Sequence, residues 1–290
     1  MYYLARAGMF LIYLLPRRIG LFVAAKIGAF AYLILPKYRN IAIDNLTYVF
    51  GKEKTPLEIR AIARKVFENL AKNAFELVQF PKINENNFEK LVNIVGRENL
   101  DAGYAKGKGI VVITAHFGNW ELMAATLRLY GCPGVTIGRR IYFYKYDQLL
   151  NYFRKVHDVN VIYRDDSPRK MLKTLKENKI VGVVADQDVD SVEGVFVDFF
   201  GRPAFTPSGP VGLARASGAA LIPVLIRRNA DDTHTVIAEK EIGLSDTGDK
   251  EKDLVENTKR WSAVIESYIR NYPEQWVWMH KRWKTQVGEK

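Results

Sequence analysis

The sequence predicts an α/β fold in which helices sandwich a mostly parallel sheet, with an N-terminal helical segment that associates with a membrane. Short runs that are apolar on both faces alternate with helical patterns, as expected when helices cover both sides of a parallel sheet. The 290 residues are 48% hydrophobic and 26% charged, enough apolar material for a buried core. We therefore divide the chain into membrane-associating helices at residues 1–50 and an α/β domain at residues 51–290.

The first fifty residues combine apolar stretches with basic side chains. Met9 to Leu15 is too short to cross a bilayer, and Pro16 ends it. The next stretch, residues 19–35, is nearly long enough but carries Lys26 near its middle. Its apolar side chains favour insertion by about 3–5 kcal/mol, and a central Lys costs about 2.5–3.5 kcal/mol. This near balance favours a monotopic or re-entrant anchor, with a true span or a helical pair packed on the domain as alternatives.

Beyond this segment, the chain alternates between helices and strands. Thr55-Pro56-Leu57-Glu58 has the form of a capping box and opens a helix to Gln79. Strands are predicted at residues 110–114, 135–138, 159–163, 180–185 and 220–226, with a possible edge strand at 236–238. Helices are predicted at residues 121–129, 145–156, 168–177, 207–216 and 252–269.

The charge balance indicates an anionic partner. The formal charge of +11 suits nucleic acid, anionic lipid or an acidic carrier protein. Because the basic residues that precede the first acidic residue, Asp44, flank apolar stretches, a bilayer is favoured and no nucleic-acid partner is expected. A single cysteine, Cys132, rules out an internal disulfide and favours a cytosol-facing location.

The sharpest local pattern is Ala115-His116-Phe117-Gly118-Asn119-Trp120-Glu121, directly after a predicted buried strand. His116 should lie at the carboxyl end of the sheet, where open α/β folds bind ligands. Gly118 suits a tight turn, and Asn119 suits a helix N-cap whose first-turn amides would face an anion or oxyanion. We expect the Glu121 carboxylate to fold back onto the imidazole and support proton abstraction. The alternative is a capped turn with a core histidine and a surface glutamate.

Polar and aromatic residues follow later strands. Asp186 and Asp188 come after another strand and suit a metal, a base-orienting contact, a substrate hydroxyl or merely a turn cap. The aromatic residues from Phe199 to Phe205 predict an acyl groove, or else simple core packing. In the same segment, Thr206 or Ser208 is expected to cap the next helix and direct its amides towards a phosphate.

Arginines recur at the same expected edge of the sheet, and their planar donors suit phosphate. We predict that they bind a phosphorylated substrate or carrier; they are Arg139, Arg140, Arg164 and Arg202. A metal is not expected, because the four histidines lack metal-site spacing and no cysteine pair exists. The serine-hydrolase motif G-x-S-x-G and the glycine motifs of nucleotide-binding proteins are absent.

These motifs, in this order, resemble the late acyltransferases of lipid A biosynthesis, the lauroyl/myristoyl-transferring group of the H-x-x-x-x-D/E glycerolipid acyltransferases. The likeness spans nearly the whole chain. It is carried by the basic apolar N-terminus, the segments 115–121, 186–188, 199–209, 213–219 and 222–224, and the closing run Pro273-Glu274-Gln275-Trp276-Val277-Trp278-Met279-His280-Lys281-Arg282-Trp283-Lys284-Thr285.

The resemblance implies that His116 and Glu121 are the catalytic pair, and that Arg164 and the Asp186 or Asp188 carboxylate bind acceptor or donor. It further implies acyl carrier protein as donor and a phosphorylated, Kdo-bearing glucosamine disaccharide lipid as acceptor. The chemistry would need no metal or other cofactor, and would take place at the cytoplasmic face of the bacterial inner membrane. The chain departs from the family after Arg140: many members have Asn-Pro there, whereas this chain has Ile141-Tyr142-Phe143-Tyr144-Lys145-Tyr146. A lysophospholipid or acylated mannoside acceptor, coenzyme A as donor carrier, and a non-catalytic lipid-binding factor are therefore the alternatives.

Overall fold

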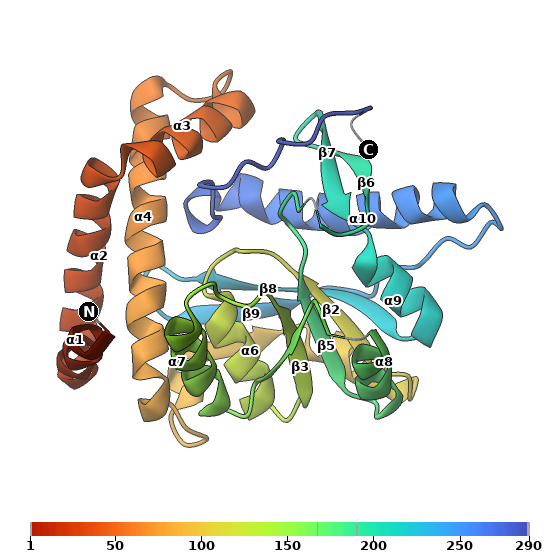
Figure 1. Ribbon diagram of the computed structural model, residues 1–290, viewed down its shortest axis with the longest axis horizontal. Coiled ribbons are helices and arrows are strands. Elements are labelled where there is room, and N and C mark those ends of the chain that lie inside the picture. The colour runs from red at the N-terminus through yellow and green to blue at the C-terminus, as the bar shows by residue number, and fades with distance from the viewer. Residues whose placement is uncertain (1, 167, 190, 289–290) are drawn as a thin grey trace.

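The computed structural model describes residues 2–166, 168–189 and 191–288. A seven-stranded sheet forms its centre, with the strand order β1-β9-β8-β2-β5-β3-β4 (Figure 1). The strands are β1 (Val92–Val95), β2 (Ile110–Thr114), β3 (Gly134–Gly138), β4 (Asn160–Tyr163), β5 (Ile180–Val184), β8 (Ala220–Arg228) and β9 (His234–Ala238).

The sheet is mostly parallel, as predicted. Strands β8, β2, β5, β3 and β4 run in one direction, whereas β9 is antiparallel to β8 and carries β1 parallel beside it. Every residue of β2 is buried, which explains its uninterrupted apolar sequence. Strand β1 was not predicted, because Val-Asn-Ile-Val is short and only its first residue is fully buried.

Helices cover both faces of the sheet. Ile110 and Val112 of β2 pack in the cluster that contains residues of α5 (Arg97–Ala105), α6 (Trp120–Leu129) and α7 (Tyr144–Lys155). Val111 and Ile113 point the other way, into the cluster with α8 (Pro168–Lys176), α9 (Gly209–Ser217) and α10 (Lys250–Asn271). This alternation confirms the predicted sandwich.

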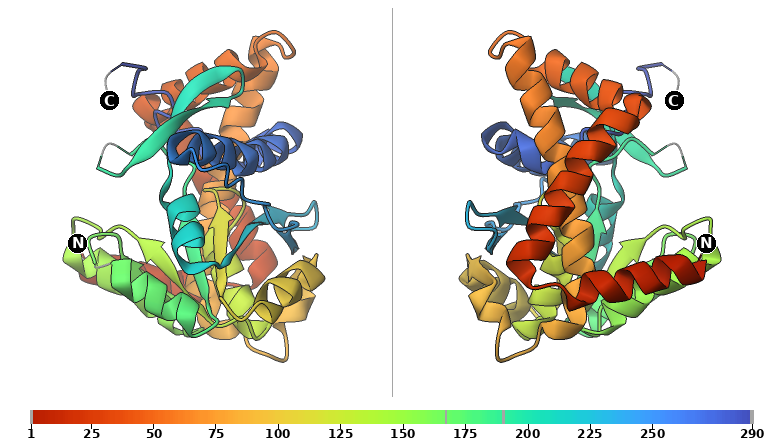
Figure 2. Two further views of the ribbon diagram at one scale, coloured as in Figure 1. Left: turned by 90° about the vertical axis from the view of Figure 1, so that its right-hand side faces the viewer. Right: turned by 90° about the vertical axis from the view of Figure 1, so that its left-hand side faces the viewer.

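The N-terminal part is helical, with α1 (Tyr2–Leu14), α2 (Arg17–Ile34), α3 (Pro36–Phe50) and the long α4 (Pro56–Gln79). The predicted capping box of Thr55 and Glu58 begins α4. Helix α2 lies along α4 (Figures 1 and 2) and approaches it closely at Gly28, where an added Cβ would come within 2.4 Å of the Phe67 carbonyl oxygen. Within the described ranges, no single helix has the length and hydropathy of a membrane span; α2 and α3 reach those values only as a pair, which is bent by 91°.

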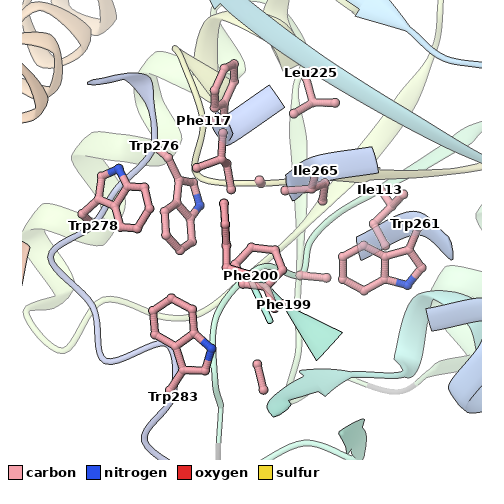
Figure 3. Packing of buried hydrophobic residues seen from close by; sticks show 14 of the residues in the cluster. Ile113, Phe117, Phe199, Phe200, Leu225, Trp261, Ile265, Trp276, Trp278 and Trp283 are labelled. Atoms are coloured by element: carbon pink, nitrogen blue, oxygen red, sulfur yellow. The ribbon is translucent and has the colours of Figure 1, made fainter. Parts of the chain in front are cut away.

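A separate hairpin, β6 (Gly194–Phe199) and β7 (Arg202–Pro207), replaces the loop expected before α9. Its Phe199, Phe200 and Phe205 are buried, and Phe199 lies 5.8 Å from Trp276 between ring centroids. Figure 3 shows Phe199 and Phe200 among Trp276, Trp278 and Trp283. These aromatic residues therefore form core, and the predicted acyl groove in this segment is wrong. Three short 3₁₀ helices complete the fold at Phe80–Lys82, Phe88–Lys90 and Pro273–Gln275.

Candidate active site

The turn after β2 fixes the position of His116. Gly118 has a φ of +56°, and a Cβ at this position would lie 1.8 Å from the carbonyl oxygen of Ile226, so only glycine fits. Asn119 caps α6 as predicted, accepting a hydrogen bond from the Leu122 amide at 3.1 Å. Its side-chain amide donates to Glu76 at 2.8 Å, which ties the turn to α4.

Asp186, from the end of β5, holds the imidazole. Its Oδ1 lies 2.7 Å from Nδ1 of His116, and its Oδ2 accepts from the His116 backbone amide at 3.0 Å and from the Trp276 indole at 2.7 Å. The carboxylate is almost fully buried, whereas the side chain of His116 is 26% exposed. Among the described residues, Nε2 of His116 has no hydrogen-bond partner. The contact between Nδ1 of His116 and Asp186 favours the tautomer with the proton on Nδ1. In this tautomer the lone pair of Nε2 is free to accept a proton.

The electrostatics of this pair keep the histidine basic. Burial by itself would lower the pKa of His116, but the charge and hydrogen bond of Asp186, together with the nearby charge of Glu121, raise this pKa above its ordinary value. Burial would raise the pKa of Asp186, but His116 and the Trp276 hydrogen bond hold it well below the usual range. The pair therefore consists of an ionised carboxylate behind an imidazole of increased basicity.

The closing segment of the chain supports the turn from the other side. The Gln275 carbonyl accepts from the Gly118 amide at 2.9 Å, and the Val277 amide donates to the His116 carbonyl at 3.1 Å. Trp276 lies between these two contacts and donates to Asp186. The sequence placed this segment in the family signature but assigned no role to Trp276, because no spacing rule links residues so far apart in the chain.

Glu121 does not make the contact that the sequence predicted. Its two carboxylate oxygens accept from the Arg154 guanidinium at 2.5 and 2.8 Å, which joins α6 to α7. Because α6 begins at Trp120, Glu121 belongs to its first turn, and its side chain reaches Arg154 of α7. The carboxylate hydrogen-bonded to His116 is Asp186, and the expected Glu121 contact is corrected accordingly.

A pocket of about 560 Å³ opens at His116 and extends between α6 and the sheet. His116 and Thr114 line one end, and Cys132, Gly134 and Ile180 lie at the other. Since Gly134 pairs with Ile180 at the start of the strands, the pocket follows β3 and β5 for about 13 Å, at roughly 3.3 Å per residue. Apolar side chains of β2, β3, β5 and α6 line the pocket together with polar groups, some beside His116 and one, Arg128, in the last turn of α6. This shape suits a ligand with a long apolar part and a reactive polar end.

Basic side chains gather around the same pocket. Arg139 and Arg164 line it, as predicted from the ends of β3 and β4, together with Arg154 and Lys284, which the sequence did not indicate. Asp188 also lines the pocket, but its carboxylate accepts from the amide and hydroxyl of Thr285 at 2.7 and 2.8 Å. The lining is therefore cationic beside His116, with Asp188 largely occupied by the C-terminal segment.

Comparison with known proteins decides the family. The chain matches the family of bacterial lipid A biosynthesis acyltransferases over residues 1–285. It belongs to this family. It is 28% identical to the lipid A biosynthesis lauroyltransferase of Escherichia coli K12 over 281 residues, 96% of this chain and 89% of that protein. It is 25% identical to the palmitoleoyltransferase of the same organism, over 95% and 88% of the two chains. The phosphatidylinositol mannoside acyltransferase of Mycobacterium tuberculosis H37Rv is 31% identical over 154 residues, 51% of this chain and 48% of that protein.

In this acyltransferase several residues predicted for the site lie elsewhere. Arg140 stacks over the Tyr163 ring at 3.9 Å, and Arg202, on the hairpin, lies over Tyr48 at 5.4 Å. Thr206 is buried and accepts from Arg282 at 2.6 Å. Ser208 precedes α9 but makes no side-chain cap. None of these four residues lines the pocket of His116.

Metal ligation was not expected for the acyltransferase, and the expectation stays a prediction. Within residues 2–166, 168–189 and 191–288, no group of three or more His, Cys, Asp or Glu side chains is arranged to hold a metal ion. His280, near Trp276, keeps both ring nitrogens buried without a partner, and burial lowers its pKa to about 4.

Proposed function

We propose that this acyltransferase transfers a fatty acyl chain from a thioester, carried by acyl carrier protein, to a hydroxyl of a lipid A precursor. One observation carries the proposal: an imidazole held through Nδ1 by a buried carboxylate offers its free Nε2 at the head of a pocket that continues along apolar side chains of β2, β3 and β5. A base of increased strength beside an apolar channel suits an alcohol that must attack an acyl group. The names of the relatives support lipid A as the acceptor.

His116 acts as the general base in this mechanism. Nε2 takes the proton of the acceptor hydroxyl as its oxygen bonds to the thioester carbonyl carbon. The carbon–sulfur bond then breaks, and the imidazolium returns the proton to the departing thiolate. Asp186 stabilises the imidazolium while it exists. General-base catalysis of this kind contributes about 10²–10⁴-fold, and the direct transfer requires no covalent acyl-enzyme, metal or other cofactor.

The channel between α6 and β5 holds the acyl chain. Gly182 lies on its floor, where an added Cβ would meet no atom closer than 3.6 Å, so a larger side chain would enter the open space. We expect Gly182→Leu to reduce transfer of long acyl chains by tenfold or more while short chains transfer at nearly the normal rate. Competition between donors of different chain length measures this ratio, with Gly182→Ala as the control. An equal loss for all lengths would place the acyl chain elsewhere.

The basic lining beside His116 binds the phosphate groups of donor and acceptor. Arg139, Arg164 and Lys284 provide three positive charges around one opening. An acidic carrier protein also suits the +11 charge of the chain. Because the donor is cytosolic and the acceptor is a lipid, we place the reaction at the cytoplasmic face of the bacterial inner membrane.

A glycolipid acceptor is the second candidate. The similarity to the mannoside acyltransferase favours it, as does the unusual sequence after Arg140. The deciding experiment offers acyl-acyl carrier protein and acyl-coenzyme A separately with a lipid A precursor, a phosphatidylinositol mannoside or a lysophospholipid. His116→Ala serves as the inactive control. Transfer from the carrier protein to the lipid A precursor is expected to be fastest. Preference for another acceptor would overturn that assignment, and no thioester consumption with any pair would indicate a non-catalytic lipid-binding protein.

A further inference from the structure

An unusually exposed group of aromatic side chains follows β3. We call residues 141–146, Ile-Tyr-Phe-Tyr-Lys-Tyr, the aromatic loop. Tyr142 is 93% exposed, Phe143 64% and Tyr144 69%. Tyr142 and Phe143 contact each other edge to face, with ring centroids 5.2 Å apart. Adjacent exposed aromatic residues of this kind mark an interaction surface more often than an isolated one does.

The base of the aromatic loop is firmly held. The buried carboxylate of Asp147 accepts from the Ile141 amide at 2.9 Å and from the Tyr163 hydroxyl at 2.5 Å. The guanidinium of Arg140 stacks over the ring of the same Tyr163. Because these contacts fix both ends of the loop, its aromatic side chains are displayed outward by the fold.

The surroundings of the loop are cationic and apolar. Residues 134–157 contain five Lys or Arg residues and one acidic residue, the buried Asp147; of the five, Arg154 is paired with Glu121 of α6. Helix α7, which the loop enters, lines a hollow of about 460 Å³ together with Met9, Phe10 and Tyr13 of α1. Figure 2 shows the N-terminal end of α1 beside this part of the chain in both views. Phe10, Leu11 and Leu14 of α1 are exposed as well, as is Tyr152 of α7, which lines the same hollow.

We infer that the aromatic loop and the exposed face of α1 dock together onto an anionic bilayer. Tyr and Phe side chains partition to the depth of lipid headgroups, and Arg and Lys beside them attract anionic lipid. The loop begins directly after Gly138 and Arg139, which line the pocket of His116. Docking would therefore hold the pocket opening at the lipid surface. Only this last consequence, direct entry of the lipid acceptor, rests on the proposed function.

An acidic protein is a less suitable partner for this surface. An acidic protein would bind mainly to Lys and Arg side chains, whereas the exposed Tyr142, Phe143 and Tyr144 present mainly apolar area. The exposed Phe and Leu side chains of α1, on the helix that shares a hollow with α7, are typical of an element that enters the bilayer interface. The carrier protein is accordingly an outcome to be tested and not the inferred occupant.

Vesicle binding by the full chain tests the inference without any substrate. The probe is a vesicle of phosphatidylcholine with about 30% phosphatidylglycerol, compared with pure phosphatidylcholine. Replacing Tyr142, Phe143 and Tyr144 by Ser should weaken partitioning to the anionic vesicles tenfold or more. A matched variant replaces three exposed apolar residues elsewhere, Leu57, Val95 and Val255, and should bind within twofold of the wild type. Equal binding by wild type and loop variant would overturn the inference, as would selective loss of carrier-protein binding.

A second measurement locates the loop directly. Tyr142→Cys provides an exposed labelling site, since the natural Cys132 is buried. An environment-sensitive dye on this cysteine should shift to the blue when anionic vesicles are added, whereas the same dye on Leu57→Cys should not. An unshifted dye at position 142 on vesicle-bound protein would show that other parts of the chain make the contact. Either result is independent of whether acyl transfer occurs.

Discussion

Two histidine–carboxylate pairs in this molecule make the same contact in different surroundings. His116 meets Asp186 at 2.7 Å at the end of β2, and His234 of β9 meets Glu76 of α4 at 3.0 Å. In both pairs the carboxylate is almost fully buried. Proximity of an acid to an imidazole therefore does not by itself distinguish a catalytic base from a structural pair.

The surroundings separate the two pairs. His234 is 0% exposed, and its Nδ1 is buried without a partner. Burial lowers the pKa of His234, and the charges of Arg228 and Arg17 oppose the effect of Glu76. Glu76 also accepts from Arg17, Arg228 and Asn119, so it serves a network of donors. His116, in contrast, has a raised pKa and a free nitrogen at a pocket. Two differences therefore decide which histidine can exchange a proton with a substrate. One is whether the ring reaches a pocket, and the other is whether nearby arginines oppose the effect of the carboxylate on the pKa of the histidine.

The largest expected effect is that of His116→Ala. Removing the base should reduce kcat for acyl transfer by about 10²–10⁴-fold, because the Nε2 that accepts the proton is lost. The substitution also leaves the buried Asp186 carboxylate without its imidazole partner, so thermal unfolding is measured in parallel and kcat is given per folded molecule. His234→Ala is the matched control in the other pair and should keep most of its kcat per folded molecule. Near-normal turnover by His116→Ala would remove the distinction between the pairs.

The second effect is on stability and belongs to the buried network. Glu76→Gln removes the carboxylate that His234 contacts at 3.0 Å and leaves Arg228 without its closest counter-charge. Breaking a buried ion pair in this way costs about 3–5 kcal/mol of unfolding free energy. Urea unfolding monitored by tryptophan fluorescence gives the value. A loss below about 1 kcal/mol, similar to that of a surface pair such as Arg64–Glu68, would mean that the network does not hold α4 to the sheet.

The smallest effect is expected for Glu121→Gln. Glu121 contributes to the raised pKa of His116 only through its charge, and its hydrogen bonds go to Arg154. We expect a decrease of about three- to tenfold in kcat/KM, with Arg154→Gln producing a similar loss. Asp188→Asn provides a comparison at another pocket carboxylate. A loss as large as that of His116→Ala would restore Glu121 as the direct partner that the sequence predicted.

The sequence predicted the sheet and most of the helices of the chain, because apolar periodicity is a local property. It also predicted the position of His116, because the Gly118-Asn119 turn directly follows a buried strand. It paired the histidine with Glu121 and gave a base-orienting contact only as one of several roles for Asp186, since Glu121 is near in sequence whereas Asp186 becomes adjacent only through the pairing of β2 with β5. Arg154, Lys284 and Trp276 were missed for the same reason. For the aromatic residues of the hairpin, the sequence left an acyl groove and core packing both open, because apolar side chains give the same pattern in a core and in a ligand site; the structure shows core packing.

The pH dependence of kcat/KM, compared between the wild type and Asp186→Asn, tests the central claim most directly. His116 must be neutral to accept a proton, so activity should fall as the pH drops through its raised pKa, at a pH above the ordinary histidine value of about 6.5. Without the Asp186 charge, burial should lower the pKa of His116, so that the acidic limb moves to lower pH while the plateau rate drops by about 10²-fold. An acidic limb that stays at the same pH in both proteins would contradict the assignment of His116, positioned by Asp186, as the general base.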